Sequence, residues 1–429
     1  MNRPAADFLI EHASAVATCA GPAPRRGRAQ HEAGLLQSGA VAAHRGRIVY
    51  VGPAGLVREA VDLEPGATRI DASGAVVVPG FVDAHTHIVY AGDRRHELQR
   101  RLAGATYADI AAEGGGILRT VMATRAATEQ SLIESGRRRL DEMLACGTTT
   151  CEAKSGYGLT TESEITLLKV IRALDAGHHI DVIATFLGAH EVPAEYRDRR
   201  SAYLDLVVTE MIPRVAAAGL AKYCDVFCED GVFSPAEATA VLETGRAAGL
   251  IPRIHADELA ASGGSEVAAR VRARSADHLV FVTPEGIEAL ADADVCAVLL
   301  PTATFYLKLG RFAPARALID RGVPVALGTD VNPGGGHSPS MPFAMALGCF
   351  GMNMTLEEAL VAATLNAAWS LDCADAVGSL EPGKLMDAVV VNVNLAELVR
   401  VGAPAIRMVI KKGEVVWGTD GGPNLSIDV

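Results

Sequence analysis

Apolar and polar residues alternate in short runs near both ends of the chain, and turn residues separate the runs. The runs are Phe8–Cys19, Ala40–Val51 and Arg69–Val78 near one end, and Met386–Val393 and Met408–Trp417 near the other. Alternation with a period of two, interrupted by Gly-rich turns, is typical of half-buried β-strands. We therefore expect both chain ends to combine in one small β-sandwich.

Between these ends the pattern changes to an apolar run, a loop and a helical stretch, repeated along the chain. Eight strands are expected, at Val77–His87, Thr148–Lys154, Val182–His190, Tyr223–Glu229, Ile251–Glu258, Ala276–Val282, Val295–Pro301 and Val323–Asp330. Helices are expected between them, for example at Glu162–Ala176, Pro235–Ala248, Glu285–Ala291 and Ala313–Arg321. Ser234 and Thr283 each precede a proline, which is the order of an N-cap and a first helical residue. Eight such units predict an α/β fold, a (β/α)8 TIM-type barrel.

The length of the chain agrees with a barrel and an accessory domain. A barrel of this type uses roughly 250 residues, and the chain has 429. We expect residues 1–78 to form the N-terminal part of the β-sandwich, residues 79–384 the barrel, and residues 385–429 the C-terminal part of the sandwich.

Charge and cysteine content exclude several classes of function. The net charge of −12 argues against a nucleic-acid partner, because phosphate binding requires clustered Lys and Arg. No apolar run approaches the length of about 18 residues that a membrane-spanning helix needs. The eight cysteines contain no Cys-x-x-Cys pair, which predicts free thiols and a cytoplasmic protein. A small-molecule substrate is therefore the expected partner.

The candidate chemistry lies at predicted strand ends. His85 and His87 flank Thr86 at the end of the first barrel strand, so both imidazoles can share a face. Alone, this pair fits two structural histidines equally well. His255 and Asp330 end the fifth and eighth strands, and the C-terminal strand ends of a barrel converge on one mouth. Three histidines and one carboxylate there predict a mononuclear site for a divalent metal ion.

These motifs resemble those of a known family. The segment from Pro79 to His87 resembles the opening motif of the amidohydrolase superfamily, and within it the chain resembles the imidazolonepropionase family. The closer resemblance rests on Gly114–Leu118, Lys154–Gly158, Gly188–His190, Ile254–Glu258, Ser275–Leu279, Leu300–Pro301, Thr304–Leu307 and Thr329–Gly334. It implies a homodimeric hydrolase that opens the ring of 4-imidazolone-5-propanoate to N-formimidoyl-L-glutamate. It also implies one metal ion per subunit, Zn²⁺ or Fe²⁺/Fe³⁺, held by His85, His87, His255 and Asp330.

That reaction gives roles to further residues. The substrate's propionate needs a cation, and the resemblance favours Arg94, although a surface arginine beside Arg95 is the alternative. Glu258 is the expected base for the attacking water. Asp257 is the competing carboxylate, with a helix cap or a supporting contact as its other interpretations. Asp330 is expected to share proton transfer while it binds the ion.

Other residues are expected to contact the substrate. His278 and His190 lie at strand ends, where they can donate hydrogen bonds to the developing oxyanion and the leaving nitrogen, and His278 is the choice for the carbonyl. Tyr157 contacts the ring or the carboxylate, or else only packs its loop. Asn332 and Gly334 match a substrate-holding loop of the family, and Gly335 is the position where this chain departs from it. The family usually has Ser or Thr after the glycine that corresponds to Gly334, so a hydroxyl contact is lost here and a backbone contact is kept.

Two other functions are compatible with parts of the pattern. A deaminase of the cytosine or guanine type shares the three histidines, His278 and the aspartate, but Arg94 and the Lys154–Gly158 loop favour a carboxylate-bearing ring. Members with two metal ions need a lysine on the fourth strand, and Cys224–Asp230 has none. A catalytically silent barrel that serves as a scaffold would typically lose metal ligands, and all four are present.

Overall fold

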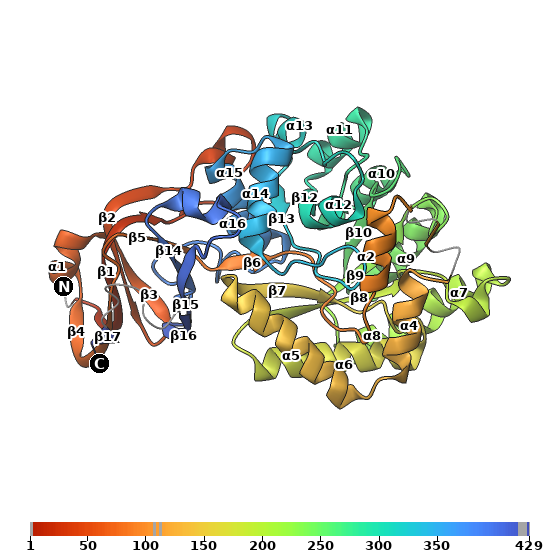
Figure 1. The fold of residues 1–429 in the computed structure, drawn as a ribbon, viewed down its shortest axis with the longest axis horizontal. Helices are drawn as coiled ribbons and strands as arrows, with labels where there is room; N and C mark the ends of the chain where they lie inside the picture. The colour runs from red at the N-terminus through yellow and green to blue at the C-terminus, as the bar shows by residue number, and fades with distance from the viewer. Residues whose placement is uncertain (1–2, 106–108, 111–113, 419–426, 429) are drawn as a thin grey trace.

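The structure is a computed structural model that describes residues 3–105, 109–110, 114–418 and 427–428. A barrel surrounded by helices makes up most of the molecule, and a second sheet built from both chain ends lies beside it (Figure 1). All eight cysteines are free thiols, as expected. Among the described helices, none is both long and apolar enough to cross a membrane.

The barrel consists of eight parallel strands in sequence order. They are β6 (Phe81–Asp83), β7 (Thr148–Lys154), β8 (Asp181–Ala189), β9 (Tyr223–Cys228), β10 (Ile251–Ala256), β11 (Ser275–His278), β12 (Cys296–Leu299) and β13 (Val325–Leu327). Just beyond β6 and β13 the backbone nitrogen of Asp330 donates to His85 O at 3.0 Å, and that of His87 donates to Val331 O at 2.8 Å. These bonds bring the first and last segments together, and the predicted barrel is confirmed.

Helices follow the strands and cover the outside of the barrel (Figure 1). The longer ones are α2 (Arg95–Leu102), α4 (Ile117–Ala126), α5 (Glu129–Ala145), α6 (Thr161–Gly177), α9 (Pro235–Ala247), α11 (Pro284–Ala293) and α14 (Met341–Met352). The shorter ones are α7 (Arg200–Leu206), α8 (Ile212–Ala217), α10 (Gly264–Arg270), α12 (Pro301–Leu307), α13 (Ala315–Asp320), α15 (Leu356–Ala362) and α16 (Leu365–Ser370). Ser234 and Thr283 accept the expected N-cap hydrogen bonds, from the backbone nitrogens of Glu237 and Gly286.

The second sheet is mixed and joins the two chain ends. Its strands are β1 (Ala5–Ala17), β2 (Leu35–His44), β3 (Arg47–Pro53), β4 (Asp62–Asp71), β5 (Ala75–Pro79), β14 (Ala388–Asn392), β15 (Ile406–Lys411), β16 (Glu414–Gly418) and β17 (Ile427–Asp428). The antiparallel pairing of β5 with β14 brings the N-terminal and C-terminal parts together. Buried side chains such as Ile10, Val77, Val390 and Met408 form one apolar cluster on this sheet. The expected small β domain made from both chain ends is therefore present, while the proposed boundaries at 78/79 and 384/385 stay predictions.

The first barrel strand differs from the expectation. The run Val77–His87 was predicted as one strand, but Val77–Pro79 belongs to β5 of the mixed sheet and β6 contains only Phe81–Asp83. Gly80 separates them, and a Cβ there would lie 2.3 Å from Thr149 Oγ1. The chain changes sheets at a point where only glycine fits, so His85 and His87 lie beyond the strand.

Several later strands end earlier than predicted, and the backbone gives the reason. His278 and Leu279 have φ of 76° and 58°, so β11 stops at His278 rather than at Val282. Asp257 has φ of 52° and directly follows β10. A left-handed conformation cannot continue the ladder of a β-strand. The turns at the strand ends fall on the residues that build the mouth of the barrel.

Candidate active site

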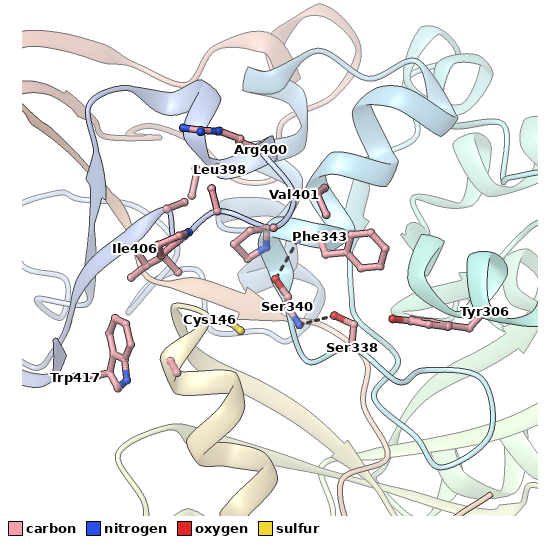
Figure 2. A pocket seen from close by; sticks show the side chains of 16 residues that line it. Cys146, Tyr306, Ser338, Ser340, Phe343, Leu398, Arg400, Val401, Ile406 and Trp417 are labelled. Atoms are coloured by element: carbon pink, nitrogen blue, oxygen red, sulfur yellow. Dashed lines mark hydrogen bonds between the residues drawn. The ribbon is translucent and has the colours of Figure 1, made fainter. Parts of the chain in front are cut away.

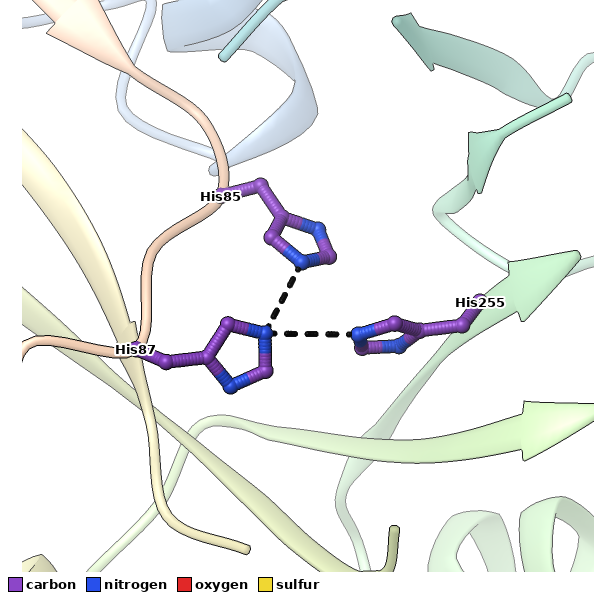
Figure 3. A group of neighbouring side chains, drawn as sticks. All are labelled: His85, His87 and His255. Carbon is purple, nitrogen blue, oxygen red and sulfur yellow. Dashed lines mark hydrogen bonds between the residues drawn. The ribbon is translucent and has the colours of Figure 1, made fainter. Parts of the chain in front are cut away.

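The four predicted metal ligands meet at the C-terminal mouth of the barrel. The Nε2 atom of His87 lies 3.2 Å from Nε2 of His85 and 3.4 Å from Nε2 of His255 (Figure 3). Oδ1 of Asp330 lies 3.6 Å from Nε2 of His85 and 3.4 Å from Nε2 of His87. Residues from three separate strand ends thus direct one donor atom each toward a common point.

The spacing of these atoms fits a metal ion. Four ligand atoms about 2.1 Å from a tetrahedral ion lie about 3.4 Å apart, which agrees with the contacts of 3.2 to 3.6 Å between Nε2 of His85, His87 and His255 and Oδ1 of Asp330. Oδ1 of Asp330 is buried and has no hydrogen-bond partner among the described residues. A buried acceptor facing other lone pairs is unfavourable unless a cation lies between them.

Two aspartates fix the orientation of the histidines. Nδ1 of His85 donates to Asp277 Oδ2 at 2.6 Å, and Nδ1 of His255 donates to Asp225 Oδ1 at 3.2 Å. Because a carboxylate accepts, the proton of each neutral ring is on Nδ1, and the Nε2 lone pair is directed toward the common point. Burial lowers the pKa of His85 well below its ordinary value, which keeps this ring in the neutral form that binds metals.

Glu258 and His278 lie beside this cluster. Oε1 of Glu258 is 3.5 Å from Nδ1 of His278, and both side chains are buried. Burial, followed by the nearby carboxylate of Asp330, raises the pKa of Glu258 well above its ordinary value. A raised pKa suits a carboxylate that has to accept and return a proton near neutral pH.

Asp257 faces away from this chemistry. Its Oδ1 accepts hydrogen bonds from the backbone nitrogens of Ser262, Gly263 and Gly264 at 3.0, 3.0 and 3.2 Å, and its Oδ2 accepts from Ser265 at 3.1 Å. These bonds satisfy the free N–H groups where α10 begins. Of the interpretations left open by the sequence, the cap describes Asp257, and Glu258 is the carboxylate that lines the pocket beside the candidate ligands.

Replacing Asp257 with alanine is expected to lower the free energy of unfolding by about 2 to 3 kcal/mol, because buried N–H groups lose their acceptor. Chemical denaturation of the purified protein measures this. Asp257→Asn retains one oxygen acceptor and should lose less. Equal stability of the alanine variant and the wild type would show that these bonds do not stabilise the fold.

Arg94 is buried rather than on the surface. It lines the pocket above the cluster with an exposed fraction of only 3%. Its Nε and Nη2 lie 2.9 and 2.7 Å from Oε2 of Glu97, and Oε1 of Glu97 accepts from the backbone nitrogen of Gly116 at 2.9 Å. A Cβ at Gly334 would lie 2.2 Å from Nη1 of Arg94, so a larger residue there would displace the guanidinium. Sequence reasoning missed Glu97, although its position three residues after Arg94 in a helical stretch is a signal.

Tyr157 and His190 form another wall of the same pocket. The Tyr157 ring lies 5.8 Å from the His87 ring and 5.3 Å from the His190 ring. Nδ1 of His190 donates to Gly156 O at 3.0 Å, and burial lowers the pKa of His190 to about 3. The ring is therefore neutral, with an acceptor at Nε2, which differs from the donor role expected from the sequence.

The loop after β13 is held by its own asparagine. Oδ1 of Asn332 accepts from the backbone nitrogens of Gly334 and Gly335 at 2.7 and 2.6 Å, and its Nδ2 donates to Asp330 O at 2.7 Å. Asn332 and Gly335 line the pocket, while the N–H groups expected to hold substrate are bonded within the loop. A substrate contact from these nitrogens would have to replace the bonds to Asn332.

The roles of two acidic residues beneath the ligands, Asp225 and Asp277, were also missed. Asp225 lies in β9 and Asp277 in β11, both with no exposed surface. Buried parallel strands are usually apolar throughout, and an acidic residue within one is uncommon unless it is paired. An acidic residue inside an otherwise apolar strand is the signal that could have identified Asp225 and Asp277.

A second, more open hollow lies between the barrel and the mixed sheet (Figure 2). It has a volume of about 520 Å³ and is lined by Cys146 after α5, Phe343 of α14, Ile406 of β15 and Trp417 of β16, among others. In the described part of the chain its lining includes no histidine or carboxylate, and the predicted site residues all lie elsewhere. The groups suited to hydrolysis are thus at the barrel mouth.

Comparison with known proteins agrees with this geometry. Residues 76–416 match the Amidohydrolase family, and the chain belongs to that family. It is 48% identical over 414 residues to an imidazolonepropionase of Geobacillus kaustophilus, covering 95% of this chain and 97% of the relative. It is 47% identical over 413 residues to an imidazolonepropionase of Symbiobacterium thermophilum, covering 96% and 97%. Within the amidohydrolases, the chain belongs to the imidazolonepropionases, as its motifs indicate.

Solved structures support the fold. An adenosine deaminase from Xanthomonas campestris with bound zinc superimposes with a TM-score of 0.70 at 20% identity, over 96% of this chain and 93% of that chain. A guanine deaminase from E. coli has a TM-score of 0.71 at 16% identity, over 96% and 99%. At these identities the similarity is one of fold.

Proposed function

We propose that this protein is a metal-dependent hydrolase that opens the ring of 4-imidazolone-5-propanoate to give N-formimidoyl-L-glutamate. The observation that carries the proposal is the cluster of His85, His87, His255 and Asp330 in a pocket that also contains Arg94. The similarity to imidazolonepropionases, near 48% identity over almost the whole chain, supports the same substrate. A homodimer in the cytoplasm belongs to this proposal.

The proposed cofactor is one divalent ion, zinc or iron, held by the three Nε2 atoms and by Asp330. When bound, it supplies Lewis acidity toward water and toward a carbonyl oxygen. The neutral histidines, their aspartate partners and the unpartnered oxygen of Asp330 suit such an ion. On β9, no lysine is available to bridge a second ion.

The side chains around the cluster suggest how the ring is opened. Glu258 takes a proton from the attacking water, whose oxygen adds to the ring carbonyl carbon. His278, in the tautomer that carries its proton on Nε2, donates from this buried atom, which has no partner among the described residues, to the oxygen that gains charge. The C–N bond then breaks, and Glu258 returns the proton to the leaving nitrogen, so that the water oxygen remains in the new carboxylate.

The other pocket residues select the substrate. Arg94, whose orientation is fixed by Glu97, is placed for a bidentate contact with the propionate. Nε2 of His190 is an acceptor and can receive an N–H of the ring. Tyr157 packs beside His190 and limits the space for the ring. A ring without a carboxylate would leave the arginine without its ligand.

Turnover of freshly prepared 4-imidazolone-5-propanoate tests the function. We expect formation of N-formimidoyl-L-glutamate, loss of activity with a chelator, and recovery with zinc or ferrous iron. Cytosine, guanine and dihydroorotate serve as competing substrates, and elemental analysis gives the number of ions per chain. Faster turnover of cytosine or guanine would identify a deaminase instead, and no turnover of any substrate by metal-loaded protein would support a scaffold.

A further inference from the structure

A lysine ammonium group is completely enclosed beneath the candidate metal site. Lys154 of β7 has no exposed surface. Its Nζ lies 2.6 Å from Oε1 of Glu152, 2.7 Å from Oδ2 of Asp225 and 3.6 Å from Oδ2 of Asp277. All three carboxylates have no exposed surface either. A charge buried this deeply is retained only where it is paired on several sides.

Two of these carboxylates are the partners of metal-ligand histidines. The oxygen of Asp277 that faces Lys154 is also the one that accepts from Nδ1 of His85. Asp225 faces Lys154 with Oδ2, and its other oxygen, Oδ1, accepts from Nδ1 of His255 at 3.2 Å. One ammonium group therefore contacts both carboxylates that orient two different ligands.

Arg253 of β10 supports the same arrangement from another side. Its Nη2 lies 3.3 Å from Oδ2 of Asp277 and donates to Ala84 O at 2.9 Å, while its Nη1 donates to Ser370 O at 2.9 Å. The guanidinium is thus anchored on the backbone as well as on Asp277. Among the described residues, no second Lys or Arg forms an ion pair with Asp225, so its position depends more strongly on Lys154.

We infer that Lys154 is a positioning residue for the metal centre: it holds Asp225 and Asp277 together, and through them it fixes His255 and His85 so that both Nε2 atoms face one point. This inference rests on the proposed metal-dependent function. Carboxylates that support ligand histidines typically change metal affinity 10- to 100-fold when they are removed. Lys154 does not hold a ligand histidine directly, but it contacts two of the carboxylates that do.

The charges of the network agree with a divalent ion. Among the described residues, the carboxylates of Glu152, Asp225 and Asp277 form ion pairs with two cations, Lys154 and Arg253. One negative charge remains there, and the buried carboxylate of Asp330 adds another beside the histidines. A divalent ion would offset these buried charges, which agrees with the proposed cofactor.

A charge-matched pair of variants tests the inference. Lys154→Met alone would leave three buried carboxylates beside one cation, and this variant is at risk of not folding. The double variant Glu152→Gln with Lys154→Met removes one negative and one positive charge, so the net charge is unchanged. Glu152→Gln alone is the reference, because it differs from the double variant only at position 154. Lys169→Met, on the exposed side of α6, controls for loss of a lysine.

Zinc affinity is measured by competition with a chromophoric chelator, and the Co²⁺-loaded proteins are compared by their visible d–d absorption. The double variant is expected to bind zinc at least 10-fold more weakly than Glu152→Gln and to show a shifted cobalt spectrum, at a similar melting temperature. Affinity within threefold of the reference, with the same spectrum, would overturn the inference. Substrate is absent from these measurements, so a wild-type protein that binds zinc but does not hydrolyse imidazolone propionate would remove the proposed function and leave this inference standing.

Discussion

Replacing Glu258 with glutamine is expected to lower kcat by a factor of about 10² to 10⁴, the usual contribution of a general acid–base group, while zinc or iron content stays unchanged. The amide cannot take the proton from the attacking water. The metal remains because His85, His87, His255 and Asp330 are all kept. Single-turnover kinetics on imidazolone propionate and elemental analysis of the same preparation measure the two quantities.

Folding should be preserved in the Glu258→Gln variant. Burial and the neighbouring Asp330 already raise the pKa of Glu258, so a neutral group of the same shape is tolerated at this position. Asp257→Asn is the matched control, since this neighbouring carboxylate binds the backbone before α10 and should lose stability rather than kcat. Wild-type kcat in Glu258→Gln would exclude Glu258 as the base, and loss of the metal would assign it to the ligand shell.

Replacing Arg94 with alanine is expected to reduce kcat/KM about 100-fold, mainly through KM, because a buried charge-assisted contact to the substrate carboxylate is lost. The single variant would also leave Glu97 buried without its guanidinium partner, which destabilises the fold. The combination with Glu97→Gln removes that unpaired charge, so the kinetic effect can be measured on a stable protein. Steady-state kinetics over a wide range of substrate concentration give KM and kcat separately.

Two comparisons show whether Arg94 recognises the carboxylate. Arg95→Ala removes the adjacent, exposed arginine and should leave KM close to that of the wild type. The amide of the substrate lacks the negative charge, so wild-type protein should prefer the acid strongly and the Arg94 variant should lose that preference. An unchanged KM for the acid in the Arg94 variant would place the propionate elsewhere in the pocket.

Much of the fold follows from local order along the chain. The repeated strand and helix pattern between the chain ends predicts the barrel, since each unit carries its own apolar period and caps such as Ser234 and Thr283. The division of Val77–His87 between two sheets was missed, although Pro79-Gly80 is a dipeptide that commonly interrupts a strand. Contact between Gly80 and Thr149 decides it, and this contact exists only after β6 and β7 pair.

The sequence by itself determined which donor atoms the site can offer. Imidazole nitrogens and one carboxylate at the ends of predicted strands suit a divalent metal ion. Only the tertiary structure decided their supports and the division of roles. The pairing of His85 with Asp277 joins residues 192 positions apart, and Lys154 reaches Asp225 and Asp277 from another strand.

The neighbouring residues Asp257 and Glu258 have different roles, because the left-handed backbone at Asp257 directs its side chain to the start of α10. Such contacts depend on barrel closure and strand register, which bring distant charges together in the buried interior, and no local pattern contains that information.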